Sequence, residues 1–165
     1  MSMIGFDAAG VRTAAEGGEF KLGTVMKFEH PTLGSQEFLY VETGEAITGL
    51  GYLCIVDSGY VAEMADSVSS APGAGFGMKL GAAQAAIESG GFGWIQTCGR
   101  GTIRTLASTA KGTQLTISAT PGAVDDATTS GLEVAGGISL GTASGGAPEA
   151  NADAYFTFPT ASRTL

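Results

Sequence analysis

Few side chains in this sequence combine the types and the spacing that catalysis or ligand binding needs. His30 is the only histidine among the 165 residues, and a lone histidine cannot supply the nitrogen ligands of a histidine-rich metal site. It could act as a general base, but no motif ties a serine, cysteine or carboxylate to it. Because Pro31 follows it, we interpret His30 as a turn or surface residue. A small hydrolase on a β-scaffold would depend on this one histidine.

Two further segments match binding motifs only in part. Asp125 and Asp126 could share a proton or bind Ca²⁺, but the ligand spacing of a calcium loop is missing. Adjacent aspartates after a Pro-Gly turn are typical of carboxylates that accept hydrogen bonds from nearby backbone N–H groups. The glycines of residues 73–77 lack the last glycine of a dinucleotide fingerprint, where Met78 stands. We therefore expect no enzyme activity, no catalytic residue, no metal site and no cofactor.

The cysteines and one pair of arginines allow two interpretations each. Cys54 and Cys98 lie in apolar, strand-like runs, and two cysteines cannot complete a metal site alone. We expect both to be reduced and buried, with a disulfide as the alternative. Arg100 and Arg104 are four residues apart on a predicted strand and so share one face, which suits contact with an acidic partner. Exposed charges on an edge strand are the alternative.

The composition excludes several classes of protein. Glycine supplies 27 residues, charged residues are only 15% of the chain, and the formal net charge is −8. Glutamate and lysine are too sparse for a coiled coil, and the negative charge disfavours direct binding of nucleic acid. A hydrophobic content of 44% is too high for a disordered acidic tail. No apolar run is long enough to span a membrane, and residues 1–10 lack the regions of a signal peptide, which predicts synthesis in the cytoplasm.

Short apolar runs bounded by turn residues predict an all-β fold, a small sandwich or barrel of about 8–10 short strands with long Gly-rich loops. Gly99–Gly101 should turn one pair of these strands into a hairpin, and the alternation of Leu115–Ala119 predicts one buried and one wet face. Met78–Ser89 suits either one short helix or a strand followed by a turn. We expect strands at Thr24–Phe28, Glu37–Glu42, Tyr52–Val56, Tyr60–Ala65, Phe92–Thr97, Thr102–Leu106, Leu115–Ala119, Leu132–Ala135, Ile138–Leu140 and Tyr155–Phe158.

The chain divides into a flexible N-terminal arm, residues 1–19, and a single β-rich domain with a C-terminal tail, residues 20–165. The arm has no hydrophobic period, and only Ile4, Phe6 and Val11 could anchor it to a partner. Such a segment is expected to become ordered when it binds.

Large aromatic side chains in a chain so rich in small residues belong either to the core or to an interface. Phe92 and Trp94 share one face of a predicted strand, and we assign Trp94 to the core. Phe156 and Phe158 are likewise two residues apart, and they stand between a loop and Pro159. We expect this second pair to form an interface.

Several segments, taken in order, resemble the tailed-phage head-decoration proteins, also called capsid cement proteins. They are Leu22–Thr24, Phe38–Glu42, Phe92–Gln96 and Leu115–Ala127, and the resemblance covers roughly Lys21–Leu140. Met78–Ser89 and the tail Ala147–Leu165 depart from the family pattern, which leaves the number of strands and the contact residues open.

The resemblance implies a virion protein, a β-rich homotrimer that binds the major capsid protein on the outer surface of an icosahedral shell and cements it. It implies no enzyme activity. The alternative is a β-rich carbohydrate-binding or adhesin-like module with Trp94 as an exposed platform. The residues that we expect at capsid or trimer interfaces are Ile4, Phe6, Val11, Arg100, Arg104, Phe156 and Phe158.

Overall fold

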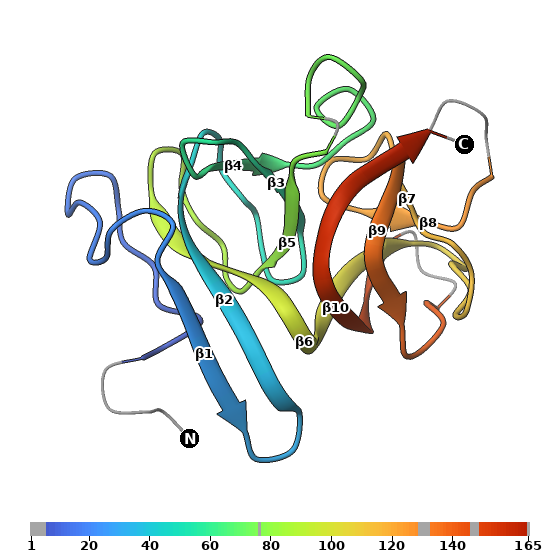
Figure 1. The fold of residues 1–165 in the computed structure, drawn as a ribbon, viewed down its shortest axis with the longest axis horizontal. Helices are drawn as coiled ribbons and strands as arrows, with labels where there is room; N and C mark the ends of the chain where they lie inside the picture. Colours follow the sequence, from blue (N-terminus) through green and yellow to red (C-terminus); the bar gives the residue numbers. More distant parts are fainter. Residues whose placement is uncertain (1–5, 76, 129–132, 146–148, 165) are drawn as a thin grey trace.

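The computed structural model describes residues 6–75, 77–128, 133–145 and 149–164, and these residues form ten strands and no helix (Figure 1). The all-β prediction is therefore confirmed, and Met78–Ser89 holds a strand followed by turns. No helix able to cross a membrane occurs in this part of the chain. The strands are β1 Val25–His30, β2 Gly34–Thr43, β3 Leu53–Val56, β4 Val61–Met64, β5 Lys79–Ala83, β6 Phe92–Leu106, β7 Thr116–Ile117, β8 Val124–Asp125, β9 Glu133–Leu140 and β10 Glu149–Thr164.

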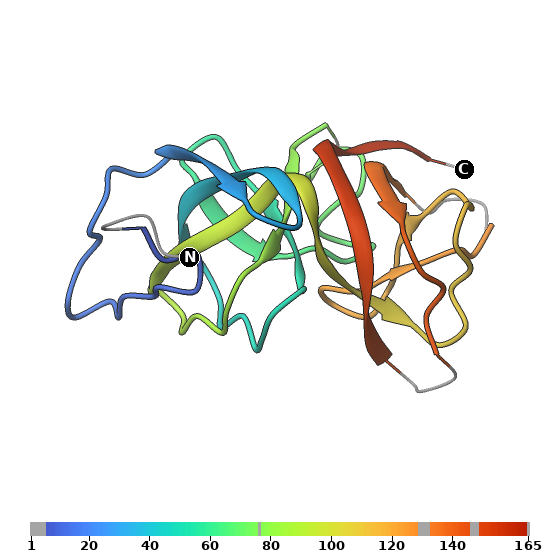
Figure 2. The ribbon, with the colours of Figure 1, turned by 90° about the horizontal axis from the view of Figure 1, so that it is seen from below.

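The strands belong to one sheet that closes on itself twice. In the first closure, β2 pairs with β4, β4 with β3, β3 with β5, β5 with β6, and β6 again with β2. In the second, β6 pairs with β8, β8 with β7, β7 with β9, β9 with β10, and β10 again with β6. We call these rings the first barrel and the second barrel. Figure 2 shows them side by side, with β6 running from one to the other.

The two barrels have the same strand topology. In each, the first strand pairs in parallel with the third, and the other four pairings of the ring are antiparallel. The parallel register also agrees, because Glu42 pairs with Val61 and Thr105 with Val124, a separation of 19 residues in both cases. The second half of the fold therefore repeats the topology of the first, with β6 as the last strand of one barrel and the first strand of the other.

Strand β6 corrects the hairpin that we expected across Gly99–Gly101. The chain does not reverse there but continues as one strand of 15 residues. Gly99 has a φ of +91°, and the register with β2 shifts between Glu37 and Phe38, so the glycine accompanies a bulge that bends the strand. A Cβ at Gly99 would overlap the carbonyl oxygen of Ser35, so this close approach of two backbones also requires glycine.

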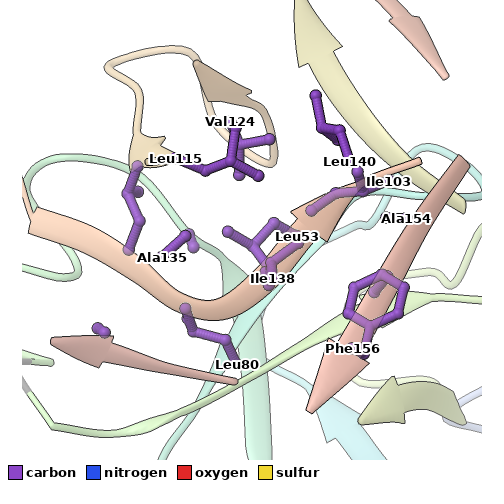
Figure 3. Close-up of a cluster of buried hydrophobic side chains, with 14 of the residues drawn as sticks. Leu53, Leu80, Ile103, Leu115, Val124, Ala135, Ile138, Leu140, Ala154 and Phe156 are labelled. Atoms are coloured by element: carbon purple, nitrogen blue, oxygen red, sulfur yellow. The ribbon is translucent and has the colours of Figure 1, made fainter. Parts of the chain in front are cut away.

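Hydrophobic side chains fill both barrels. Leu39, Val41, Val56 and Ile95 are among those that point into the first barrel. The interior of the second barrel includes Ile103 and Phe156, and it continues onto the outer face of β3 and β5 through Leu53 and Leu80 (Figure 3). Alternate residues of β3 and β5 therefore contribute to different cores, which explains why these short strands are apolar on both faces.

Segment Leu115–Ala119 corrects a second expectation, since it has no wet face. Leu115, Thr116, Ile117 and Ser118 are all buried. The Thr116 hydroxyl lies within hydrogen-bond distance of the carbonyl oxygens of Asp125 and Ala127, and the Ser118 hydroxyl of two carbonyl oxygens of its own turn. Polar residues that alternate with apolar ones can therefore be buried when the neighbouring backbone accepts their hydrogen bonds.

Candidate interaction surface

An irregularity in β10 determines the orientation of Phe158, which is the most exposed aromatic side chain among the described residues. Phe156 pairs with Ile138 and Thr160 with Gly136, so three residues of β10 stand opposite Gly137 alone. Phe158, in the middle of the three, has a φ of +51°, and Gly137 has a φ of +83°. Pro159 has no N–H to donate to the ladder, and the Thr157 hydroxyl donates to the Gly137 carbonyl at 3.1 Å. The sequence thus interrupts the ladder at this point.

This irregularity separates the two aromatic residues that we expected to share a face. Phe156 is 1% exposed and belongs to the interior of the second barrel, so its assignment to an interface is wrong. Phe158 is 60% exposed. In a regular strand residues two apart point the same way, but the left-handed conformation of Phe158 breaks that alternation and turns its ring to solvent.

The Phe158 ring lies beside a cavity where β1 and β2 approach β10. The cavity has a volume of about 170 Å³, and its lining is mostly apolar, with Leu39, Leu80 and Pro159 buried at its floor. Val25, the first residue of β1, is 47% exposed and lines the same cavity. We call Val25, Phe158 and this apolar floor the Phe158 patch. Nothing in the sequence distinguishes Val25 from the other apolar residues of the expected strand Thr24–Phe28.

Charged side chains border the Phe158 patch. Lys79 lines the cavity, and its Nζ lies 5.9 Å from the centre of the Tyr60 ring. Glu37 lines it as well, and its carboxylate lies 3.3 Å from Lys27 Nζ. An apolar centre with a charged rim is the arrangement found in protein interfaces. The patch therefore combines exposed apolar side chains with a charged border.

Arg100 and Arg104 share one side of β6, as predicted, but their acidic partners lie within the chain. Arg100 donates to Asp153 at 2.9 Å, and this hydrogen bond raises the pKa of the guanidinium. Arg104 pairs with Glu149 and lies 4.1 Å over the Tyr52 ring. Strand β6 is not an edge strand, because β10 pairs along it and carries both carboxylates. The geometry therefore corrects the expectation of an acidic partner outside the chain.

The N-terminal segment lies against the first barrel. Phe6 is 7% exposed, and its ring packs edge-on against Trp94 with 5.1 Å between ring centres. Arg12 forms a β-bridge with Phe92, and the Glu19 N–H donates to the Tyr40 hydroxyl at 3.0 Å. Phe6 is therefore a residue of the chain's own core, which corrects its place among the interface candidates. These contacts favour order in residues 6–19 before any partner binds.

The other anchors expected in this segment have different outcomes. Val11 is 45% exposed and stays a candidate for contact with a partner. Ile4 lies outside the described residues. Trp94 is 3% exposed, covered by Phe6 and in ring contact with Phe20, so its assignment to the core is confirmed.

The side chains that were considered for catalysis or metal binding accept hydrogen bonds from backbone N–H groups. His30 ends β1, and its Nδ1 accepts the N–H groups of Thr32 and Leu33, both at 3.2 Å. Asp125 accepts the N–H of Asp126, and Asp126 accepts that of Ala110 at 3.0 Å. The aspartates therefore accept backbone N–H groups as expected, although Asp125 belongs to β8 and not to a turn. Within the described ranges, no group of three or more His, Cys, Asp or Glu side chains is placed to hold a metal ion.

Both cysteines carry free thiols, and they differ in burial. Cys54 points into the first barrel, where burial raises the pKa of its thiol to about 12. Cys98 is only half-buried, at the bend of β6, so the expectation that both are buried holds for Cys54 alone. The prediction of reduced cysteines agrees with this arrangement.

Comparison with known proteins adds no relative. The sequence matches no protein-family model, and a search of curated proteins found no similar sequence.

Proposed function

We propose that this chain is a structural virion protein that binds the outer surface of a phage icosahedral capsid and stabilises the shell. The sequence resemblance names the class, and the Phe158 patch is the structural observation that supports it. The patch presents an exposed aromatic ring and an exposed valine at the junction of two barrels. Exposed apolar side chains gathered in one place mark sites of contact with a partner.

The backbone of Phe158 strengthens this assignment. A bulky residue in the left-handed region is uncommon and costs about 1–2 kcal/mol relative to an ordinary strand conformation. Asparagine or glycine would adopt the same conformation more easily, yet the chain has a phenylalanine whose ring contributes little to its own core. Strain that does not serve the fold is found at functional positions.

Such a protein would stabilise a shell by mass action. If it binds the assembled capsid and not the free subunits, each occupied site contributes RT ln(1 + [L]/Kd), roughly 2.7 kcal/mol at a hundredfold excess over Kd. The major capsid protein is the proposed partner. Like charge of −8 on every copy would limit aggregation of the free protein, and apolar patches supply the contact area.

The test uses shells that lack the protein and purified protein added back. Wild-type protein should bind a saturable number of sites and raise the temperature at which the shell releases its DNA. Phe158→Ser should weaken binding about 30-fold, because central aromatic residues carry about 2 kcal/mol or more of interface energy. Tyr155→Ser is the matched control, since Tyr155 is 48% exposed on the same strand outside the patch. Saturated binding without a gain in shell stability would refute the cementing role.

We also propose that the protein forms a closed homotrimer, as the resemblance implies. Closed symmetry buries apolar patches without open-ended growth. Native mass spectrometry of the free protein and imaging of decorated shells would measure the number of copies. Monomers in both experiments would contradict the proposal.

The carbohydrate-binding alternative gains no support from the site. Trp94, suggested as an example of an exposed platform for it, is covered by Phe6.

A further inference from the structure

Strand β1 is the free edge of the sheet. Within the described residues every other strand has at least two partners, whereas β1 pairs with β2 alone. The hairpin of β1 and β2 projects from the body of the protein, as Figure 1 shows. Along β1, exposed residues alternate with half-buried ones, and the strand contains no proline and no bulge that would block another strand. An edge of this kind can add a strand from a second chain.

The hydrogen bonding of β1 with β2 determines which backbone groups are free. The Tyr40 N–H donates to the Thr24 carbonyl at 2.9 Å, and antiparallel neighbours alternate between bonded and non-bonded pairs. The even-numbered residues of β1 therefore direct their backbone groups toward β2. The N–H and C=O groups of Val25, Lys27 and Glu29 point to the free edge, and the side chains of these three residues are exposed as well.

Because only the odd-numbered residues of β1 have free backbone groups, two copies of β1 can pair in few registers. An antiparallel ladder needs odd-numbered residues opposite odd-numbered residues, since only these have free backbone groups. One allowed register places Lys27 opposite Lys27 at the centre, where like charges repel. The next places Lys27 of each copy opposite Glu29 of the other, with Phe28 on the two-fold axis. In that register each Lys27 lies between Glu29 of the other copy and Glu37 of its own β2, which it already contacts at 3.3 Å.

We propose that β1 is a self-association surface, at which two copies of this chain pair antiparallel through Lys27 and Glu29. The occupant is a second copy because the charges on the strand complement each other in the register that the backbone allows. Val25 then stands opposite Pro31 of the second copy at each end, and because proline has no N–H the ladder ends at these positions.

This two-fold contact is compatible with the proposed trimer. Pairing of a strand with itself is isologous and generates a two-fold axis, whereas a trimer needs a separate, heterologous contact. An icosahedral shell has axes of both kinds, so β1 pairing would join neighbouring trimers on it. Only this statement about the shell rests on the proposed function; the pairing itself is a property of the free protein.

The experiment measures the mass of the free protein against concentration by analytical ultracentrifugation. A monomer should double its mass as concentration rises, and a trimer, which carries three β1 edges, should at least double its mass. Lys27→Glu and Glu29→Lys should each raise the midpoint concentration of doubling about tenfold, because each reversal opposes two charge pairs. An equimolar mixture of the two variants should restore doubling, since the pair formed between them regains both opposite-charge contacts. Lys111→Glu, which makes the same charge change at an exposed site elsewhere, should leave the midpoint unchanged.

Three outcomes would overturn the proposal. They are a wild-type mass that stays constant up to millimolar concentration, a mixture of the two variants that fails to double, and a Lys111→Glu effect equal to that of Lys27→Glu. Urea unfolding of each variant checks that β1 still folds, and the restored mixture would exclude misfolding independently. Because no shell is present, failure of capsid binding and failure of β1 pairing are separate results.

Discussion

Replacing Phe158 by glycine and by alanine separates the cost of its backbone conformation from the loss of its ring. Both variants remove the ring, so the difference between them reports the Cβ. At a φ of +51° alanine retains a cost of about 1–2 kcal/mol that glycine does not have. Against this, glycine has greater freedom in the unfolded chain, which destabilises it by about 0.5–1 kcal/mol. The glycine variant should therefore be the more stable one, by roughly 0.5–1 kcal/mol.

The same pair of substitutions at Tyr155 is the control. Tyr155 is comparably exposed on β10, and its φ is not positive, so glycine there should be less stable than alanine by about 0.5–1 kcal/mol. The unfolded-chain contribution is common to both sites and cancels, which leaves a difference between sites of about 1–2 kcal/mol. Urea unfolding of the four variants measures it, provided that the slopes agree. If the glycine variant is less stable than the alanine variant at both sites, the backbone of Phe158 is not strained.

Four further predictions concern buried and tightly packed residues. Cys98 should react with a thiol reagent in the native protein well before Cys54, and equal rates would contradict the burial of Cys54. Because burial raises the folded pKa of Cys54 to about 12, its contribution to the free energy of unfolding should be constant below pH 9 and should fall as pH rises from 9 toward 12. The difference in free energy of unfolding between the wild type and a Cys54→Ala variant should show this fall, and a difference that does not change with pH would contradict it. Phe6→Ala should lower the free energy of unfolding by about 3 kcal/mol, because it removes a buried ring that packs on Trp94. It should also shift the fluorescence of the single tryptophan to the red and speed hydrogen exchange in residues 6–19. Fast exchange in these residues of the wild type would instead support a mobile arm. Gly99→Ala should lower the free energy of unfolding by at least about 1 kcal/mol more than Gly112→Ala, because both glycines have positive φ but only Gly99 also faces a backbone oxygen. Equal losses of stability in the two variants would contradict the close approach of the two backbones at Gly99.

Local signals in the sequence were sufficient to predict elements whose partners lie nearby in the chain. The hairpin of β3 and β4 follows from an apolar run and the turn residues after Val56. The turn at Pro121–Gly122 is present as expected, with Gly122 at a φ of +76° and the Ala123 N–H donating to the Thr120 carbonyl at 3.2 Å. In both cases the backbone preference of a few residues determines the structure.

Features that depend on distant segments could not be predicted in the same way. Gly99 is compatible with a turn and with a bulge, and the choice depends on pairing with β2 on one side and β10 on the other. The orientation of Phe158 depends on Gly137, which belongs to a different strand. Phe6 shows no period because the residues around it come from several strands, and a single buried side chain on an irregular segment leaves no pattern in the sequence.

The shared strand β6 has a consequence for the order in which the chain folds. Every strand of the first barrel has been synthesised once the chain reaches Cys98, whereas the second barrel cannot close before β10, which begins at Glu149. During synthesis the C-terminal half of β6 therefore extends from a completed barrel before β10 has been made, and the backbone groups that pair with β10 have no partner in this interval. Strands that wait for a distant partner fold slowly and are prone to pair with other chains. The many small residues of this half, from Cys98 to Leu106, offer little apolar surface to such encounters during that interval.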